Sequence, residues 1–214
     1  MSGLFKWAGR KDPPPAAETP PAAGAADIVT TSKVLPRLLA ALAHQPSPVL
    51  VDLGPVVGSN IAFFGDRLSC KIHVEDLFHE VEVAAQKGAL ASLSSALDRR
   101  LSHVADSVDG ILCWDLFDFL DRPTGLALAA RLSSMLRKGG VVYGFFGTTP
   151  TELKHYTRFV VEAADKLRQR PYPATPVKRT VLVTRDINRM FDGLVVAESV
   201  LLKSNTREAL FRKP

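Results

Sequence analysis

The stretch from Val49 to Asn60 constrains the fold of this chain more than any other. It reads VLVDLGPVVGSN, a short β-branched apolar run that ends in an acid and is followed by two glycines, Gly54 and Gly58. The residues from Ile61 onward have the character of a helix. A strand, a tight glycine turn and a helix together place backbone N–H groups and a helix N-terminus beside a nucleotide-like ligand. The sequence therefore predicts an α/β fold with a ligand site at this turn.

The 214 residues suffice for one full α/β domain and leave little for a second. Residues 1–27 are rich in proline and alanine, which supply few backbone donors and bury little surface. We therefore predict a disordered or extended tail over 1–27 and a single domain over 28–214. Phe5 and Trp7 in this tail suggest a protein partner, with a frayed terminus as the alternative.

Composition and spacing argue against several classes of protein. Cys70 and Cys113 lack CxxC spacing and the five histidines form no HxxxH pattern, so we expect neither a metal site nor a disulfide framework. Because no apolar run reaches the roughly 18–20 residues of a membrane span and no signal peptide is evident, a soluble cytoplasmic protein without a membrane partner is expected. The net charge is +5, but no basic run with interleaved aromatic residues predicts nucleic-acid binding.

Hydrophobic periodicity and turn residues predict the elements of the domain. We expect strands at 49–53, 70–76, 107–114, 141–146 and 194–202. We expect helices at 33–43, from 61, and at 77–85, 126–136, 151–168 and 186–191. Ser32 is the expected cap of the first helix, 171–176 a proline-rich connector, and 207–212 the second strand of a closing hairpin. Residues 86–107 fit no clear pattern. The alternation predicts a doubly wound sheet with one antiparallel strand.

Four features together resemble the class I S-adenosylmethionine-dependent methyltransferases of types 11 and 12. They are VDLGPVVG at 51–58, Glu75 twenty-one residues after Gly54, VDGILCWDLF at 108–117, and MLRKGGVV at 135–142. They occur in the order of that family and at about its spacing, and the resemblance covers roughly residues 30–213. It implies a Rossmann-like, mostly parallel seven-stranded sheet, methyl transfer as the activity, S-adenosylmethionine as the cofactor and a small molecule as the acceptor.

The resemblance also implies which residues bind the cofactor. Gly54 and Gly58 would let the backbone approach the ligand, since neither has a Cβ. Glu75 would accept hydrogen bonds from both ribose hydroxyls, with Asp76 as the alternative acid and a solvated strand end as the alternative role. Asp52 would orient the glycine turn or lie near the amino-acid portion of the cofactor, unless its charge is simply satisfied by backbone amides.

Three further residues belong to the expected site. Asp115, at the mouth of a buried strand, is the candidate catalytic residue, because it could hold the ammonium group of the cofactor or take a proton from the acceptor. Trp114 would form a wall beside the adenine or the substrate, with core packing as the alternative. Asp98 would meet the adenine amino group.

One residue departs from the family pattern, because Val56 replaces the middle glycine of the turn. A β-branched residue forced to a positive φ costs about 1–3 kcal/mol. Either the turn keeps a negative φ at Val56 or cofactor binding is weakened. The alternative function is therefore a catalytically inactive methyltransferase-like domain that acts as a binding or interaction module. A nicotinamide-dependent oxidoreductase is disfavoured by the missing GxGxxG and by the closing hairpin.

Overall fold

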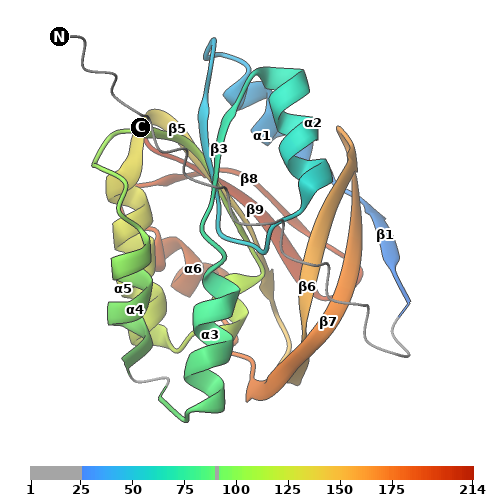
Figure 1. Cartoon of the computed structure of the whole chain (residues 1–214), viewed down its shortest axis with the longest axis vertical. Helices are drawn as coiled ribbons and strands as arrows, with labels where there is room; N and C mark the ends of the chain where they lie inside the picture. Colours follow the sequence, from blue (N-terminus) through green and yellow to red (C-terminus); the bar gives the residue numbers. More distant parts are fainter. Residues whose placement is uncertain (1–25, 90–91) are drawn as a thin grey trace, which may run out of the picture.

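A computed structural model describes residues 26–89 and 92–214, and its centre is a mostly parallel sheet (Figure 1). Its strands, in spatial order, are β3 (Lys71–Val74), β2 (Val49–Asp52), β4 (Val108–Trp114), β5 (Leu136–Gly147), β9 (Thr206–Arg212) and β8 (Val195–Leu201). The first four are parallel to one another, whereas β9 is antiparallel to β5 and β8 is antiparallel to β9. The α/β class and the closing hairpin are thus confirmed.

Helices cover both faces of this sheet, as the doubly wound prediction requires. In Figure 1, α1 (Leu35–Leu42) and α2 (Gly58–Leu68) lie on one side of the sheet, and the remaining long helices lie on the other. These are α3 (Leu77–Gln86), α4 (Leu93–Arg100) and α5 (Arg122–Met135), with the short α6 (Thr184–Met190) packed on α5. Within the described residues this sheet has six strands, whereas the family resemblance implied seven. The described part of 86–107, where a further strand was hardest to place, contains the helix α4 and no strand.

Local sequence explains the elements that were predicted well. All seven residues of β4 are buried, as expected for a central parallel strand. The stripe of leucines on α1 faces the core, and its last residue, Leu42, is buried like the others. The first helix begins at Leu35, two residues later than predicted, and its N-cap residue is Val34 in place of the expected Ser32, whose hydroxyl nevertheless accepts a hydrogen bond from the Leu35 N–H at 2.7 Å.

Residues 151–178 are the largest departure from prediction. The expected helix at 151–168 is wrong, and so is the proline-rich connector at 171–176. The segment instead forms two long antiparallel strands, β6 (Glu152–Ala163) and β7 (Lys166–Lys178), and β1 (Ile28–Thr31) adds to β7 to make a second, three-stranded sheet. The prolines are tolerated because β1 pairs only with residues 166–169, which leaves the proline-containing half of β7 as an edge strand.

The β6–β7 hairpin is anchored on the helices that follow β2 and β3. It runs beside α2 and α3 along the right of Figure 1. On α3, Glu82 accepts hydrogen bonds from the Tyr156 hydroxyl at 2.8 Å and from the Thr175 N–H at 2.9 Å. At the start of α2, the Asn60 side chain donates to the carbonyl of Phe159 and accepts from the N–H of Val161, each at 2.8 Å. Asn60 therefore hydrogen-bonds to the β6 backbone as a neighbouring strand would.

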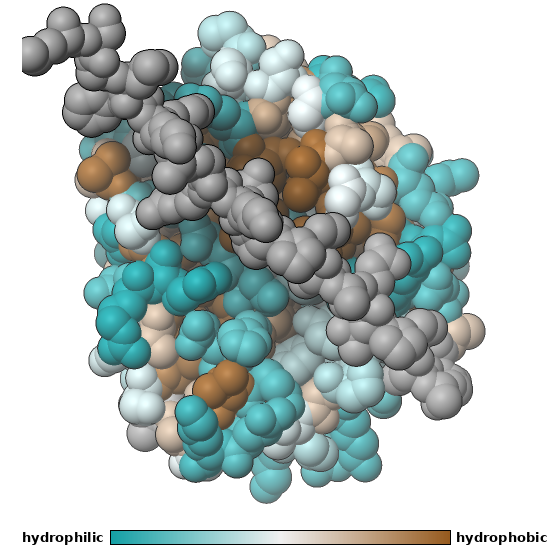
Figure 2. Space-filling view, viewed as in Figure 1, coloured by the Kyte–Doolittle hydropathy of each residue, from teal (hydrophilic) through white to brown (hydrophobic). Residues whose placement is uncertain are grey.

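The surface of the domain is largely polar. Figure 2 shows hydrophilic side chains over most of one face, with apolar ones gathered over the region of α2, where Ile61 is exposed. Within residues 26–89 and 92–214, no helix has the length and apolar character needed to cross a membrane. Residues 1–25 of the predicted tail lie outside the described part of the chain.

Candidate functional site

The carboxyl ends of β2, β3 and β4 bring most of the predicted site residues to one place. Asp52 of β2 is paired in register with Val74 of β3 and Leu112 of β4. The N–H of Glu75 donates to the carbonyl of Asp52 at 2.8 Å, which holds the two strand ends together. We call Asp52, Gly54 and Glu75 the cradle, because they line the position that the methyltransferase resemblance assigns to the cofactor.

Trp114 occupies the space beside the glycine turn. A Cβ added to Gly54 would lie 2.7 Å from Cδ1 of the Trp114 ring, so this position needs a glycine to admit the indole. The Trp114 Nε1 donates to Oδ1 of Asp52 at 2.6 Å, and the Gly54 N–H donates to the same oxygen at 2.9 Å. Burial raises the pKa of Asp52 to about 6, although both hydrogen bonds oppose the rise. The turn, the acid and the indole thus form one buried unit.

The hairpin covers this unit from the other side. Trp114 stacks on Phe159 of β6, with ring centroids 5.0 Å apart and planes 6° from parallel. Phe159 in turn stacks on Phe145 of β5, with centroids 4.9 Å apart. Trp114 is only 2% exposed and has a φ of 51°, a left-handed conformation that is unfavourable for a bulky side chain. The contacts around the side chain therefore hold the backbone of Trp114 in a strained conformation.

Glu75, the predicted ribose acceptor, is already engaged. Its Oε1 lies 2.9 Å from Nε2 of His103, and its carbonyl accepts a hydrogen bond from Arg100 at 2.6 Å. Both partners come from the stretch 86–107, which sequence reasoning left unassigned. The carboxylate remains at the cradle, but a ribose would have to compete with His103 for it.

Val56 does not strain the turn. Its φ is negative and the residue is 58% exposed. Of the two alternatives given by the sequence, the turn therefore keeps a negative φ at Val56. Gly58 is the first residue of α2, and a Cβ added there would meet no atom within 4 Å.

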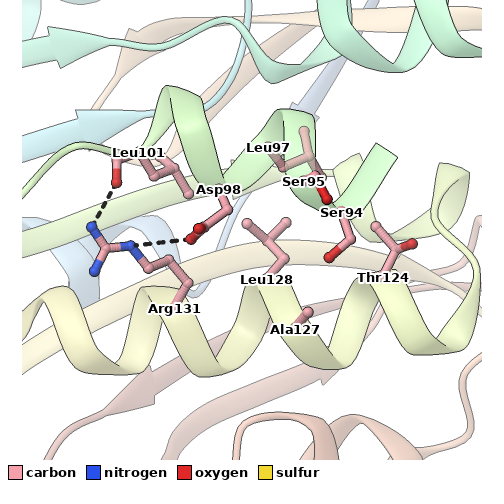
Figure 3. Close-up of a pocket in the computed structure, with 9 residues that line it drawn as sticks. All are labelled: Ser94, Ser95, Leu97, Asp98, Leu101, Thr124, Ala127, Leu128 and Arg131. Carbon is pink, nitrogen blue, oxygen red and sulfur yellow. Dashed lines mark hydrogen bonds and ion pairs between the residues drawn. The ribbon is translucent and has the colours of Figure 1, made fainter. Parts of the chain in front are cut away.

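Asp98 lies apart from the cradle. It belongs to α4 and its carboxylate is 3.8 Å from Nε of Arg131 on α5 (Figure 3). Both residues line a cavity of about 180 Å³ between these two helices, together with Ser94 and Thr124. The Asp98 side chain is 74% exposed. The expected contact of Asp98 with the adenine amino group stays a prediction, and the distance of this residue from the cradle does not favour it.

Asp115, the predicted catalytic residue, faces a second cavity of about 140 Å³ at the ends of β4 and β5. Among the described residues, its solvent-shielded Oδ1 has no hydrogen-bond partner. Asp118, three residues later, accepts from the N–H of Gly147 at 2.8 Å and has its Oδ2 2.9 Å from Nε of Arg179. Burial, and then repulsion from Asp118, raise the pKa of Asp115 to about 7. We call this the acidic cavity.

Sequence reasoning missed Asp118 and Asn60, whereas the basic pair Lys178 and Arg179 was expected to help shape the acceptor site. Asp118 lies in a short 3₁₀ turn, Leu116–Phe119, which Asp115 precedes. The three-residue spacing between the two acids was the feature of the sequence that could have indicated Asp118. Arg179 follows β7, so its place in the cavity depended on the hairpin that was predicted wrongly. In the ranges 26–89 and 92–214, no group of three or more His, Cys, Asp and Glu side chains is arranged to hold a metal ion.

No protein-family model matches the chain, and no curated protein matches it in sequence. Solved structures do match it in fold. The PH0226 protein of Pyrococcus horikoshii OT3 superposes with a TM-score of 0.51 and 9% identity, over 85% of this chain and 89% of that one.

Two further matches are methyltransferases. The Burkholderia thailandensis 1,6-didemethyltoxoflavin-N1-methyltransferase, solved with bound 1,6-didemethyltoxoflavin and S-adenosylhomocysteine, has a TM-score of 0.48 and 14% identity, over 85% of this chain and 77% of that one. A Clostridium acetobutylicum S-adenosylmethionine-dependent methyltransferase has a TM-score of 0.44 and 11% identity, over 82% and 90%. The strand order and the closing hairpin described above give this chain the Rossmann-like fold of the class I methyltransferases.

Proposed function

We propose that this chain is a non-catalytic domain of the methyltransferase fold, which acts by binding and whose cofactor cradle is closed by its own Trp114. One observation carries the proposal, namely the indole of Trp114 lying 2.7 Å from where a Cβ of Gly54 would be. We infer that the indole fills space that S-adenosylmethionine would need beside the glycine turn, so that the cofactor enters only after the indole moves. The acids expected to bind it have protein partners, Trp114 for Asp52 and His103 for Glu75.

The proposal depends on how firmly Trp114 is held. Its 2% exposure, its hydrogen bond to Asp52 and its stacking on Phe159 all stabilise the closed arrangement. The hairpin that carries Phe159 is itself fixed by Asn60. Opening the cradle therefore requires the loss of aromatic burial and of a buried hydrogen bond at the same time, and any ligand for the open state binds more weakly by that cost.

Calorimetry tests the proposal directly. S-adenosylhomocysteine and S-adenosylmethionine are titrated into the full chain after a thermal melt has shown that the protein is folded. We expect no binding heat at ligand concentrations up to about 1 mM. A dissociation constant in the micromolar range would overturn the proposal, because a closed cradle leaves no space for such a site.

A second function, methyl transfer from S-adenosylmethionine to a small-molecule acceptor, is favoured by Asp115. Its unpartnered Oδ1 faces a cavity lined by Phe159, the residue on which Trp114 stacks. A carboxyl group with a pKa of about 7 is well matched to accept a proton from an N–H or O–H acceptor at neutral pH. Micromolar binding of the cofactor in the titration above would favour this function over the first.

A further inference from the structure

The acidic cavity is built by segments that are far apart in sequence. Asp115 follows β4, Phe145 belongs to β5, Thr157 and Phe159 belong to β6, and Thr206 begins β9. Each segment is fixed by its own sheet pairing, so the cavity of about 140 Å³ is formed without any ligand. This volume suits a molecule of a few non-hydrogen atoms.

Among the described residues, two buried polar atoms of this cavity lack a hydrogen-bond partner, Nε of Arg179 and Oδ1 of Asp115, and only the first has an ion-pair partner, Asp118. Asp118 is 3% exposed, and its two carboxylate oxygens are engaged by the Gly147 N–H and by Arg179. Oδ1 of Asp115 is shielded from solvent and has no partner among the described residues. Because buried polar atoms in folded proteins are nearly always hydrogen-bonded, this oxygen indicates that a donor is missing from the cavity.

The charges of the cavity select the kind of donor. Arg179 lies 2.9 Å from Asp118, so these two charges compensate each other. Asp115 is then the unbalanced group, and an anionic ligand would be repelled by two carboxylates while finding the guanidinium already paired. A cation that carries N–H donors would supply both the missing hydrogen bond and the missing charge. The aromatic rings of Phe145 and Phe159 provide apolar contact for a short alkyl chain.

We propose that the acidic cavity binds a small primary alkylammonium compound, whose ammonium group donates to Oδ1 of Asp115 and whose alkyl part lies against Phe145 and Phe159. A bound ammonium group should lower the raised pKa of Asp115, because a neighbouring cation favours the ionised carboxylate. The proposal does not depend on whether the cradle opens, because none of the groups that it uses belongs to the cradle.

Three probes of equal length test the proposal on the full chain: propylammonium chloride, n-propanol and sodium propionate, at matched ionic strength. We expect propylammonium to bind in calorimetry with a dissociation constant of about 1–10 mM or lower, and to raise the melting temperature. Propanol should bind at least about tenfold more weakly, and propionate should give no heat. Equal binding of propylammonium and propanol, or no binding of propylammonium at about 50 mM, would overturn the proposal.

Two variants place the bound cation. Asp115→Asn should weaken propylammonium binding by about tenfold or more, because the amide keeps the shape and removes the charge. Asp106→Asn is the matched control, since Asp106 is exposed, pairs with Lys213 and precedes β4 at the opposite end of the strand. Unchanged binding in Asp115→Asn would contradict the assignment. If that variant fails to fold, the contrast among the three probes on the wild-type chain still decides the matter.

Discussion

Replacing Trp114 by alanine should open the cradle to a nucleoside ligand. A buried tryptophan covers about 150–250 Å², which contributes about 4–6 kcal/mol at ~25 cal/mol per Å². The hydrogen bond to Asp52 adds about 1.5–3 kcal/mol, and relief of the left-handed backbone at Trp114 returns about 1–3 kcal/mol. The net cost of opening is therefore about 4–6 kcal/mol. At about 1.4 kcal/mol per tenfold, this lowers the affinity of the wild-type cradle by about 10³–10⁴.

Calorimetry with S-adenosylhomocysteine measures the effect. A cradle that binds with a dissociation constant of about 1 µM when open would bind at about 1–10 mM in the wild type. Trp114→Ala should therefore tighten binding by at least about a hundredfold, and should cost about 3–5 kcal/mol of unfolding free energy in urea. Trp114→Phe is the control, because a phenyl ring still fills most of the space beside Gly54. Equal affinities of the alanine and phenylalanine variants, or micromolar binding by the wild type, would refute the reasoning.

Three further predictions concern stability and partners. The pKa values of Asp115 and Asp52 are raised to about 7 and about 6, so the folded state binds protons more strongly than the unfolded one and stability should fall as pH rises from about 4 to about 7. Urea unfolding at several pH values measures this slope, and Asp115→Asn should flatten it; a stability that rises over that range would contradict it. Asn60→Ala should cost about 2–4 kcal/mol and reduce hydrogen-exchange protection of the Val161 amide, because two backbone groups of β6 lose their partner; unchanged protection would argue against that anchor. If residues 1–27 carry a partner site, deleting them should abolish capture of that partner in a pull-down, and capture that is independent of the deletion would exclude the tail.

The sequence predicted the central part of the fold because its signals there are local. The fully buried run of β4 and the leucine stripe of α1 each follow from neighbouring residues, and each is present in the structure. The hairpin at 151–178 was predicted wrongly because its apolar residues also suit a helix. Prolines in its second half normally argue against a strand. Only the place of β7 at the outer edge of a second sheet makes those prolines acceptable.

The site was predicted in part for the same reason. Strand ends are readable from local patterns, so Asp52, Glu75 and Asp115 were correctly expected at one edge of the sheet. Sequence spacing does not say which way a side chain turns or what it meets. For that reason the pairings of Asp98 with Arg131, of Glu75 with His103 and of Asp118 with Arg179 were outside its reach.

The sequence by itself determined the class of fold and the position of the glycine turn, because periodicity and turn residues act over a few neighbouring residues. Only the tertiary structure decided what fills the space beside Gly54. The Trp114 indole reaches this space from the end of another strand, and Phe159 of the β6–β7 hairpin stacks on the indole. Asn60, which anchors that hairpin, lies about a hundred residues before Phe159 in the sequence. Such contacts depend on the packing of distant segments, whereas the turn itself depends on a few consecutive residues.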